Sequence, residues 1–256
     1  MVYGQGGVIV MRRFFTLLKI EGKLTLRCID SVFFGVIMPL GIALLIGMIS
    51  GDKPAFDGAT YSFLDANIPA IITVGICATA FMGIPLTIAD YRDKKILKHY
   101  FVTPVSPLII LAVHGIIQMI LAVFSSVIII IAMKLIFSYS MILSIGKFIL
   151  SYFLVLISMY GFGMLIASVC KSVKRTNLVC TLVYFPMLFL SGATIPFAMF
   201  PKSIQSFANF LPLTQGIKLL KGCALGLDTS LTTPLLVMII STIMTVVLSI
   251  KLFRWE

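Results

Sequence analysis

Six long stretches of this sequence contain no aspartate, glutamate, lysine or arginine. They cover residues 31–50, 68–89, 108–133, 148–170, 178–200 and 232–250. Each is close to the roughly 20 apolar residues that a helix needs to cross a bilayer, at about 1.5 Å of rise per residue. With only 11% charged residues, the chain has too little polar surface to cover such helices in water. The pattern predicts an all-α integral membrane protein with six transmembrane helices in a single domain, residues 1–256.

The basic residues predict which side of the membrane each connecting segment faces. Of the 20 lysines and arginines, 14 lie in the four segments 1–30, 90–107, 171–177 and 251–256, which alternate with less basic ones. Lysine and arginine near the ends of spans are retained in the cytoplasm. We therefore expect both termini to be cytoplasmic. The net charge of +11 follows from this topology and gives no reason to expect a nucleic-acid partner.

Residues 12–27 carry a basic stripe that suits an amphipathic helix. Arg12, Lys19, Lys23 and Arg27 are seven, four and four residues apart. Such a helix lies flat in the headgroup layer, with its cations on anionic lipid. The pattern predicts an N-terminal interfacial helix; the alternative is a basic flank of the first span.

The segment 90–107, DYRDKKILKHYFVTPVSP, places two acids before a run of lysines. Asp90 and Asp93 come first, the order that a helix dipole favours when the lysines lie toward the C-terminal end. Asp90 and Lys94 are also spaced for an ion pair within one helix. These charges predict a helix that begins near Asp90, in a cytoplasmic loop between spans two and three.

The same segment has a small apolar face. Leu97, Tyr100 and Phe101 recur at helical spacing, and Pro104 and Pro107 end the helix. A short helix with an exposed apolar face, rimmed by charge, suits a groove on another protein. The alternative is a solvated connector between two spans.

A second short helix is predicted between Pro201 and Pro212. Apolar residues recur there at i, i+3, i+4 and i+7. They are Ile204, Phe207, Ala208 and Leu211. The segment is too short and too polar to span a membrane, so we expect it to lie on the external face or to re-enter the membrane between spans five and six.

Prolines and glycines inside the apolar stretches predict local features of the spans. Pro39 and Pro85 remove backbone hydrogen bonds and are expected to kink or end their helices. Gly161 and Gly163, and Gly192 after Ser191, are expected to allow close approach of neighbouring helices.

His114 and Gln118 form a possible polar pair one turn apart in the third span. Because polar groups in hydrocarbon are costly, they should face protein or water. Two interpretations stay open: a contact with substrate or a proton, or a hydrogen bond between helices.

The sequence lacks the motifs of an enzyme or a self-powered pump. No G-x-x-x-x-G-K-[ST] is present, no His/Cys/Asp/Glu set has metal-ligand spacing, and the six stretches contain no acid. We therefore expect no catalytic residue, metal or cofactor in this chain.

The 90–107 loop resembles that of the ABC-2 type permeases, the membrane subunits of ABC exporters. In that family the loop typically reads acid, basic residue, Gly-Thr, Leu-Lys, then Val-Thr-Pro-Val-Ser. The matching residues here are Asp93, Lys94, Leu97, Lys98, Val102, Thr103, Pro104, Val105 and Ser106. Lys95 and Ile96 depart from it, because the family commonly has Gly-Thr there.

Residues 190–214 resemble a second motif of the same family: Leu-Ser-Gly, spaced prolines, a short external helix and a closing Pro-x-Thr. The matching residues are Leu190, Ser191, Gly192, Pro196, Pro201, Pro212 and Thr214. With six spans and internal termini, the resemblance covers essentially the whole chain.

The resemblance implies a permease of the plasma (inner) membrane that exports an amphiphilic substrate, drug-like, lipid-like or antibiotic-like. It implies a complex with a second permease protomer and two ATPase subunits, which bind ATP and Mg, in contact with membrane lipid. The 90–107 helix would be the coupling helix that enters a cleft of the ATPase. The implied contacts are Asp93, Lys94, Leu97, Lys98, Tyr100 and Phe101, with Thr103 and Pro104 at the exit.

Two other functional classes fit the bare residues. In an ATP-independent channel or secondary transporter, 90–107 would be only a loop. A membrane immunity or scaffold protein would protect by binding alone. The sequence leaves open the identity of the substrate and whether the dimer is homomeric or heteromeric.

Overall fold

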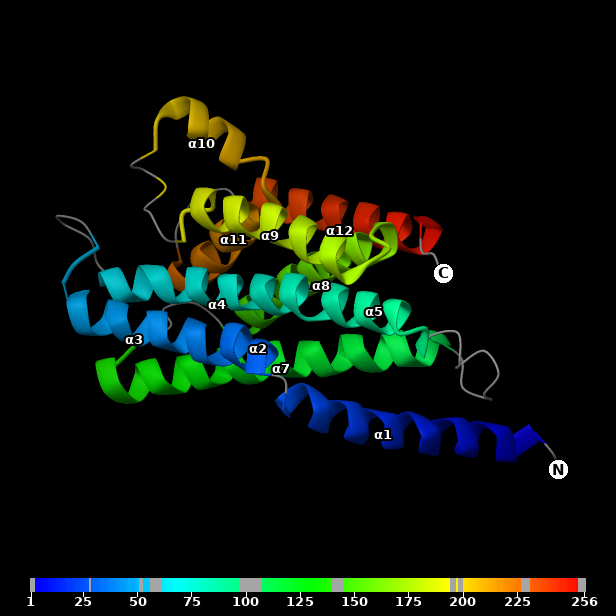
Figure 1. Cartoon of the computed structure of the whole chain (residues 1–256). Helices are drawn as coiled ribbons and strands as arrows, with labels where there is room; N and C mark the ends of the chain where they lie inside the picture. Colours follow the sequence, from blue (N-terminus) through cyan, green and yellow to red (C-terminus); the bar gives the residue numbers. More distant parts are fainter. Residues whose placement is uncertain are drawn as a thin grey trace.

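The computed structural model describes residues 3–27, 29–50, 53–55, 61–96, 107–139, 145–193, 197, 200–226 and 231–252. Its helices form a bundle (Figure 1). They are α1 Tyr3–Arg27, α2 Ile29–Val32, the π-helix η1 Phe33–Ile37, α3 Met38–Ser50, α4 Phe63–Met82, α5 Ile84–Asp93, α7 Pro107–Phe137, α8 Ile145–Val169, α9 Val173–Leu190, α10 Lys202–Ala208, α11 Pro212–Leu225 and α12 Thr232–Leu252. Both chain termini lie at one end of the bundle, and α10 lies at the other.

The prediction of an all-α membrane fold is confirmed. In the described part of the chain, five helical segments are long and apolar enough to cross a membrane. They are Phe63–Asp93, Ile109–Phe137, Ile145–Val169, Val173–Leu190 and Thr232–Leu252. A shorter apolar helix, Phe33–Ile49, occupies the first predicted stretch. The fifth stretch was placed too late, because α9 takes in the basic residues before 178 and ends at Leu190.

The helix α4 is the centre of the bundle. It packs against α3, α7, α8, α9 and α11, and most of its side chains are buried. A capping box starts it: Ser62 Oγ accepts a hydrogen bond from Asp65 N at 3.0 Å, and Ser62 N donates to Asp65 Oδ2 at 3.1 Å. A helix that is apolar on all sides is stable only where neighbours surround it, which explains its position.

The expected irregularities at Pro39 and Pro85 are present. The π-helix η1 ends two residues before Pro39. Proline has no backbone N–H to donate, and the regular hydrogen-bond pattern of an α-helix is interrupted there. Near Pro85, α4 ends at Met82 and α5 begins at Ile84, with Gly83 between them. A Cβ atom on Gly83 would lie 2.5 Å from the Thr79 carbonyl oxygen and 2.6 Å from Gln118 Cδ, so a larger residue would force the backbone at this break to shift.

Two of the three glycine predictions agree with the packing. Gly161 faces Thr245 of α12, and Gly163 faces the Ala80 carbonyl of α4, so both allow close approach of helices. The prediction for Gly192 was wrong. Gly192 follows the end of α9 with φ of +85°, so its function is to turn the chain after the helix.

Gly163→Ala is expected to lower the free energy of unfolding by about 2 kcal/mol, because the new methyl group would overlap the Ala80 carbonyl oxygen. Thermal unfolding of the full chain in detergent measures this. Gly115→Ala in α7 is the matched control, since a Cβ there meets no atom within 4 Å. It should be neutral or stabilising by up to about 1 kcal/mol. Equal effects of the two changes would contradict the assigned contact.

Between α9 and α12 the described residues form the helices α10 and α11, although only one helix was predicted there. α10 begins after Pro201, as expected, but ends at Ala208. Phe207 of its predicted apolar face is exposed, while Ala208 is buried. The second helix, α11, is mostly buried against α4, α8 and α12.

Candidate functional site

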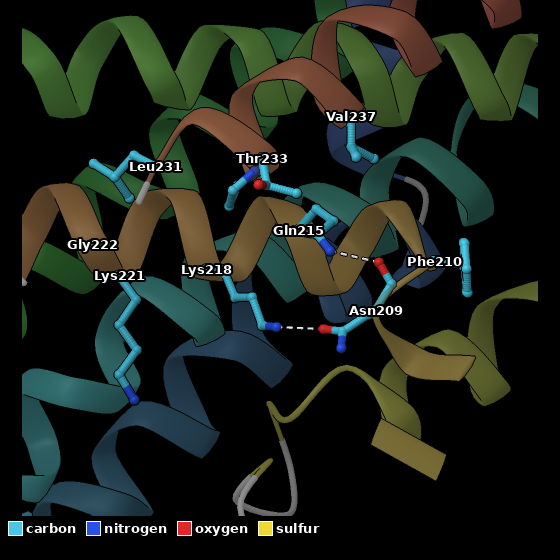
Figure 2. A pocket seen from close by; sticks show the side chains of 10 residues that line it. Asn209, Phe210, Gln215, Lys218, Lys221, Gly222, Leu231, Thr233 and Val237 are labelled. Carbon is cyan, nitrogen blue, oxygen red and sulfur yellow. Dashed lines mark hydrogen bonds between the residues drawn. The ribbon is translucent and has the colours of Figure 1, made fainter. Parts of the chain in front are cut away.

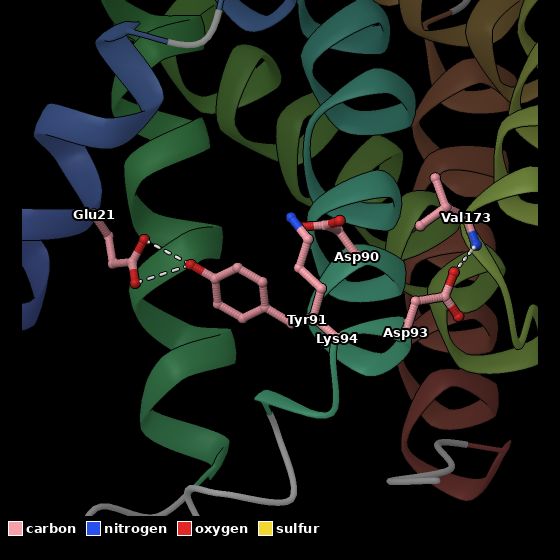
Figure 3. A network of polar contacts seen from close by, with 6 residues as sticks. All are labelled: Glu21, Asp90, Tyr91, Asp93, Lys94 and Val173. Carbon is pink, nitrogen blue, oxygen red and sulfur yellow. Dashed lines mark hydrogen bonds and ion pairs between the residues drawn. The ribbon is translucent and has the colours of Figure 1, made fainter.

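Three consecutive residues at the end of α5 join it to three other helices, and Figure 3 shows two of them, Tyr91 and Asp93. Tyr91, Arg92 and Asp93, here called the α5 hub, contact α1, the end of α8 and the start of α9. Successive residues of a helix point about 100° apart, so one turn can reach three neighbours. The hub lies at the start of the predicted coupling segment, residues 90–107, and Asp93 belongs to both.

Tyr91 connects the hub to α1. Its hydroxyl donates to both carboxylate oxygens of Glu21, at 3.0 and 2.9 Å. His114 of α7 lies against the same pair, with Nε2 at 3.6 Å from Glu21 Oε2 and its ring edge-on to the Tyr91 ring. Glu21 is only 6% exposed, so a carboxylate is held among three helices. These polar contacts fix α1 against α5 and α7.

Arg92 connects the hub to α8. Its Nη1 donates to the backbone oxygens of Ala167, at 3.2 Å, and Cys170, at 2.5 Å. These carbonyls lie at the C-terminal end of α8, where they have no donor within the helix. A cation also complements the negative end of the helix dipole. Arg92 is 8% exposed, so the guanidinium is part of the packed interior.

Asp93 connects the hub to α9. Its Oδ2 accepts a hydrogen bond of 2.9 Å from the backbone N of Val173, the first residue of α9. A carboxylate at this position complements the positive end of the helix dipole. Arg92 thus places a positive charge at the C-terminal end of α8, and Asp93 places a negative charge at the N-terminal end of α9.

The predicted start of the coupling helix was wrong. Asp90 and Asp93 lie in the last turn of α5, which continues from the second span, and not in the first turn of a new helix. The spacing rule for Asp90 and Lys94 is confirmed, because Lys94 Nζ lies 2.8 Å from Asp90 Oδ2. The acids occupy a C-terminal turn because Asp93 caps another helix, α9.

Most of the predicted ATPase contacts lie outside the described residues. They are Leu97, Lys98, Tyr100, Phe101, Thr103 and Pro104. Asp93 and Lys94 are described and exposed, and Lys94 follows α5 as its C-cap. The coupling helix itself stays a prediction.

His114 and Gln118 face different partners. His114 lies against Glu21 and Tyr91, whereas Gln118 packs on Gly83 at the break between α4 and α5. Both side chains are buried. Their surroundings are helices α1, α4 and α5, which favours the interpretation as contacts between helices.

The motif of residues 190–214 marks the ends of helices. Leu190 ends α9, and Ser191 Oγ donates to the Leu188 carbonyl at 2.9 Å. Pro201 is the N-cap of α10, and Pro212 is the first residue of α11. Thr214 follows in α11 and is fully buried. Gly192 supplies the turn described above, and Pro196 lies outside the described residues.

Glu21, Tyr91 and Arg92 were missed as site residues. Glu21 lies between Lys19 and Lys23 in an amphipathic pattern, so nothing nearby in the sequence marks it as a buried contact. Arg92 was counted as a loop charge, because its partners are backbone carbonyls that carry no sequence signal. One signal in the sequence could have indicated the Glu21–His114 contact. Glu21 is an acid among basic residues, and His114 is a histidine in an apolar span.

Comparison with known families identifies the fold. The family model described as "ABC-2 type transporter" matches residues 12–225, well over half of the chain. The chain belongs to the ABC-2 type transporter family. The ABC-2 permease is therefore a multi-pass membrane protein and a transport subunit, of a family that normally works with an ATPase subunit.

Two similar proteins share a short region with this ABC-2 permease. Nodulation protein J of Rhizobium leguminosarum bv. viciae is 41% identical over 64 residues, 25% of each chain. Nodulation protein J of Rhizobium leguminosarum bv. trifolii is 39% identical over 64 residues, 25% of this chain and 24% of that protein. The match thus spans about a quarter of the length of these relatives.

Lys95, where ABC-2 permeases commonly have glycine, adopts a left-handed backbone conformation with φ of +58°. This conformation costs an L-residue roughly 1–2 kcal/mol and glycine little. The common glycine therefore has a physical reason: the chain turns sharply out of α5 at this residue. Its amide still donates to the Arg92 carbonyl at 3.0 Å.

Lys95→Gly in the ABC-2 permease is expected to raise the free energy of unfolding by about 1 kcal/mol, because it relieves the left-handed strain. Thermal unfolding of the full chain in detergent measures this. Lys94→Gly is the matched control, because Lys94 has an ordinary φ of −77°. That change should destabilise the chain. A loss of stability in Lys95→Gly would contradict the turn.

Proposed function

We propose that this chain is the transmembrane subunit of an ATP-driven exporter, which moves an amphiphilic substrate out across the plasma membrane. A separate ATPase subunit binds ATP and Mg and docks on the coupling segment from the cytoplasm, where both chain termini lie. The complex contains two permease protomers and two ATPase subunits.

The α5 hub is the observation that carries this proposal. A push on the coupling segment would reach α5 first, because residues 94–96 continue directly from it. From there Tyr91, Arg92 and Asp93 offer contacts to α1, α8 and α9. The contacts of Arg92 are buried and that of Tyr91 is partly buried, and such short polar contacts transmit displacement directly because protein interiors are close-packed. The arrangement suits a transport subunit that is driven by ATP hydrolysis in a separate protein.

The family assignment supports the same conclusion. ABC-2 members normally work with an ATPase subunit. The excess of basic residues in 1–30, 90–107, 171–177 and 251–256 supports a cytoplasmic position for the docking face.

Transport by purified components tests the proposal. The permease is reconstituted in phospholipid vesicles with a candidate partner ATPase, and a panel of amphiphiles is followed with ATP or a non-hydrolysable analogue. Substrate movement should require both the ATPase and hydrolysis. Equal movement by the permease alone would contradict the proposal and indicate a channel or a secondary transporter.

A further inference from the structure

A pocket of about 640 Å³ lies beside α11, at the turn from α10 and the start of α12 (Figure 2). Its volume is in the range of sites that hold drug-sized ligands. The lining residues are Asn209, Phe210, Gln215, Lys218, Lys221, Gly222, Leu231, Thr233, Pro234 and Val237. None of them belongs to the α5 hub or to the coupling segment.

The polar side of the pocket is formed largely by one face of α11. Gln215, Lys218 and Lys221 follow at intervals of three residues, and the two lysines extend to the same side of the helix (Figure 2). Lys218 Nζ donates to Asn209 Oδ1 and lies 4.4 Å from the centre of the Phe197 ring. Gln215 Nε2 donates to the Asn209 carbonyl at 2.5 Å. The Lys218 ammonium is thus held in place by neutral groups.

Neither lysine is neutralised by an acid in the part of the chain that the structure describes. Among the described residues, no carboxylate lies within ion-pair distance of either ammonium, and Lys221 forms no hydrogen bond or ring contact. Both side chains are half-buried, and desolvation lowers the pKa of each. A cation partly removed from water without an anionic partner is unfavourable, and a bound anion would relieve that cost.

The other side of the pocket is apolar. Phe210, Leu231, Pro234 and Val237 contribute to it, from the start of α12 and the turn before α11. A free inorganic anion would leave this surface unused. A molecule with an anionic headgroup and an alkyl chain would use both sides, whereas a cationic amphiphile would meet two like charges.

We propose that this pocket binds an anionic amphiphile, with the headgroup on Lys218 and Lys221 and the alkyl chain along Leu231, Pro234 and Val237. This proposal rests on the proposed function, because it takes the bound molecule to be the exported amphiphile. It adds that this amphiphile carries a negative charge. Asn209 and Gln215 are positioning residues, because they hold Lys218 at the pocket wall.

Photolabelling tests the site without any ATPase. The full permease in phosphatidylcholine nanodiscs is labelled with a twelve-carbon alkyl phosphate that carries a diazirine on its chain, and labelled peptides are identified by mass spectrometry. Label is expected on the peptide containing 231–237. Lys218→Met and Lys221→Met should each raise the half-saturating concentration about tenfold, since each removes a charge-assisted contact. Lys221→Arg, which keeps the charge, should remain within about threefold.

Controls separate the site from general partition into lipid. Lys147→Met, an exposed lysine in α8, should label as the unchanged protein does. Unlabelled dodecyl phosphate should compete, and dodecyltrimethylammonium should not. Unchanged labelling of Lys221→Met with unaltered thermal stability would overturn the proposal, and so would equal competition by the ammonium compound. If inorganic phosphate competed as well as dodecyl phosphate, the proposal of an amphiphile would be overturned and the pocket would be a site for a free anion.

The two experiments fail independently. Loss of the labelling result would leave ATP-dependent export in vesicles untouched, because that assay screens other amphiphiles. Conversely, site-specific labelling with no ATP dependence of transport would contradict the proposed energy source and retain the pocket.

Discussion

Arg92→Met is expected to lower the free energy of unfolding by about 3 kcal/mol and to abolish ATP-dependent export. The change leaves the Ala167 and Cys170 carbonyls at the end of α8 without their donor, in a place that water reaches poorly. Hydrogen bonds to a charged group contribute about 1.5–3 kcal/mol each, and methionine keeps most of the aliphatic packing. Thermal unfolding of the full chain and export in vesicles measure the two effects.

Arg175→Met is the matched control for this change. Arg175 lies in the first turn of α9, close in sequence to the same turn between helices, but it is exposed. Its replacement should alter the stability by no more than about 0.5 kcal/mol. If both arginine variants behave alike, the bonds of Arg92 to α8 do not carry the stability assigned to them.

Leu97→Asp is expected to abolish both export and co-purification of the ATPase, while the chain still inserts in the membrane. On the proposed function, Leu97 is an apolar anchor of the coupling helix in a cleft of the ATPase. A carboxylate there would have to lose its water without gaining a partner, and central apolar anchors carry much of the energy of such interfaces. Affinity purification of the complex and vesicle transport measure the outcome.

Leu97→Met supplies the comparison, because it keeps the apolar character and the approximate volume. It should retain ATPase binding and most of the export. Full export by Leu97→Asp with normal ATPase recovery would remove the coupling-helix assignment, whatever the result for Arg92→Met.

Local chemistry explains what could be predicted from the sequence. Apolar runs without charge can be stable only as helices in lipid or in a buried bundle, so the all-α membrane class could be predicted. Pro85 has no backbone donor wherever it lies, so the break between α4 and α5 follows from one residue. The start of α10 after Pro201 has the same kind of cause.

Contacts over long sequence distances explain what could not be predicted. Arg92 binds carbonyls 75 and 78 residues away, and Tyr91 binds Glu21 70 residues away. Backbone oxygens look alike in every sequence, so nothing in the local pattern distinguishes a buried arginine from a loop arginine. The helix α11 was not predicted, because its burial depends on the neighbouring helices α4, α8 and α12.

The α5 hub also limits how α5 can move. Its three anchors point in different directions, so a rotation of α5 about its own axis would break at least one of them. Bending at Gly83 meets less resistance, because Pro85 leaves the Phe81 carbonyl without its helical donor. A hinge at Gly83 is therefore the motion that this geometry would permit in the second span, with α5, α1 and the α8–α9 turn moving together.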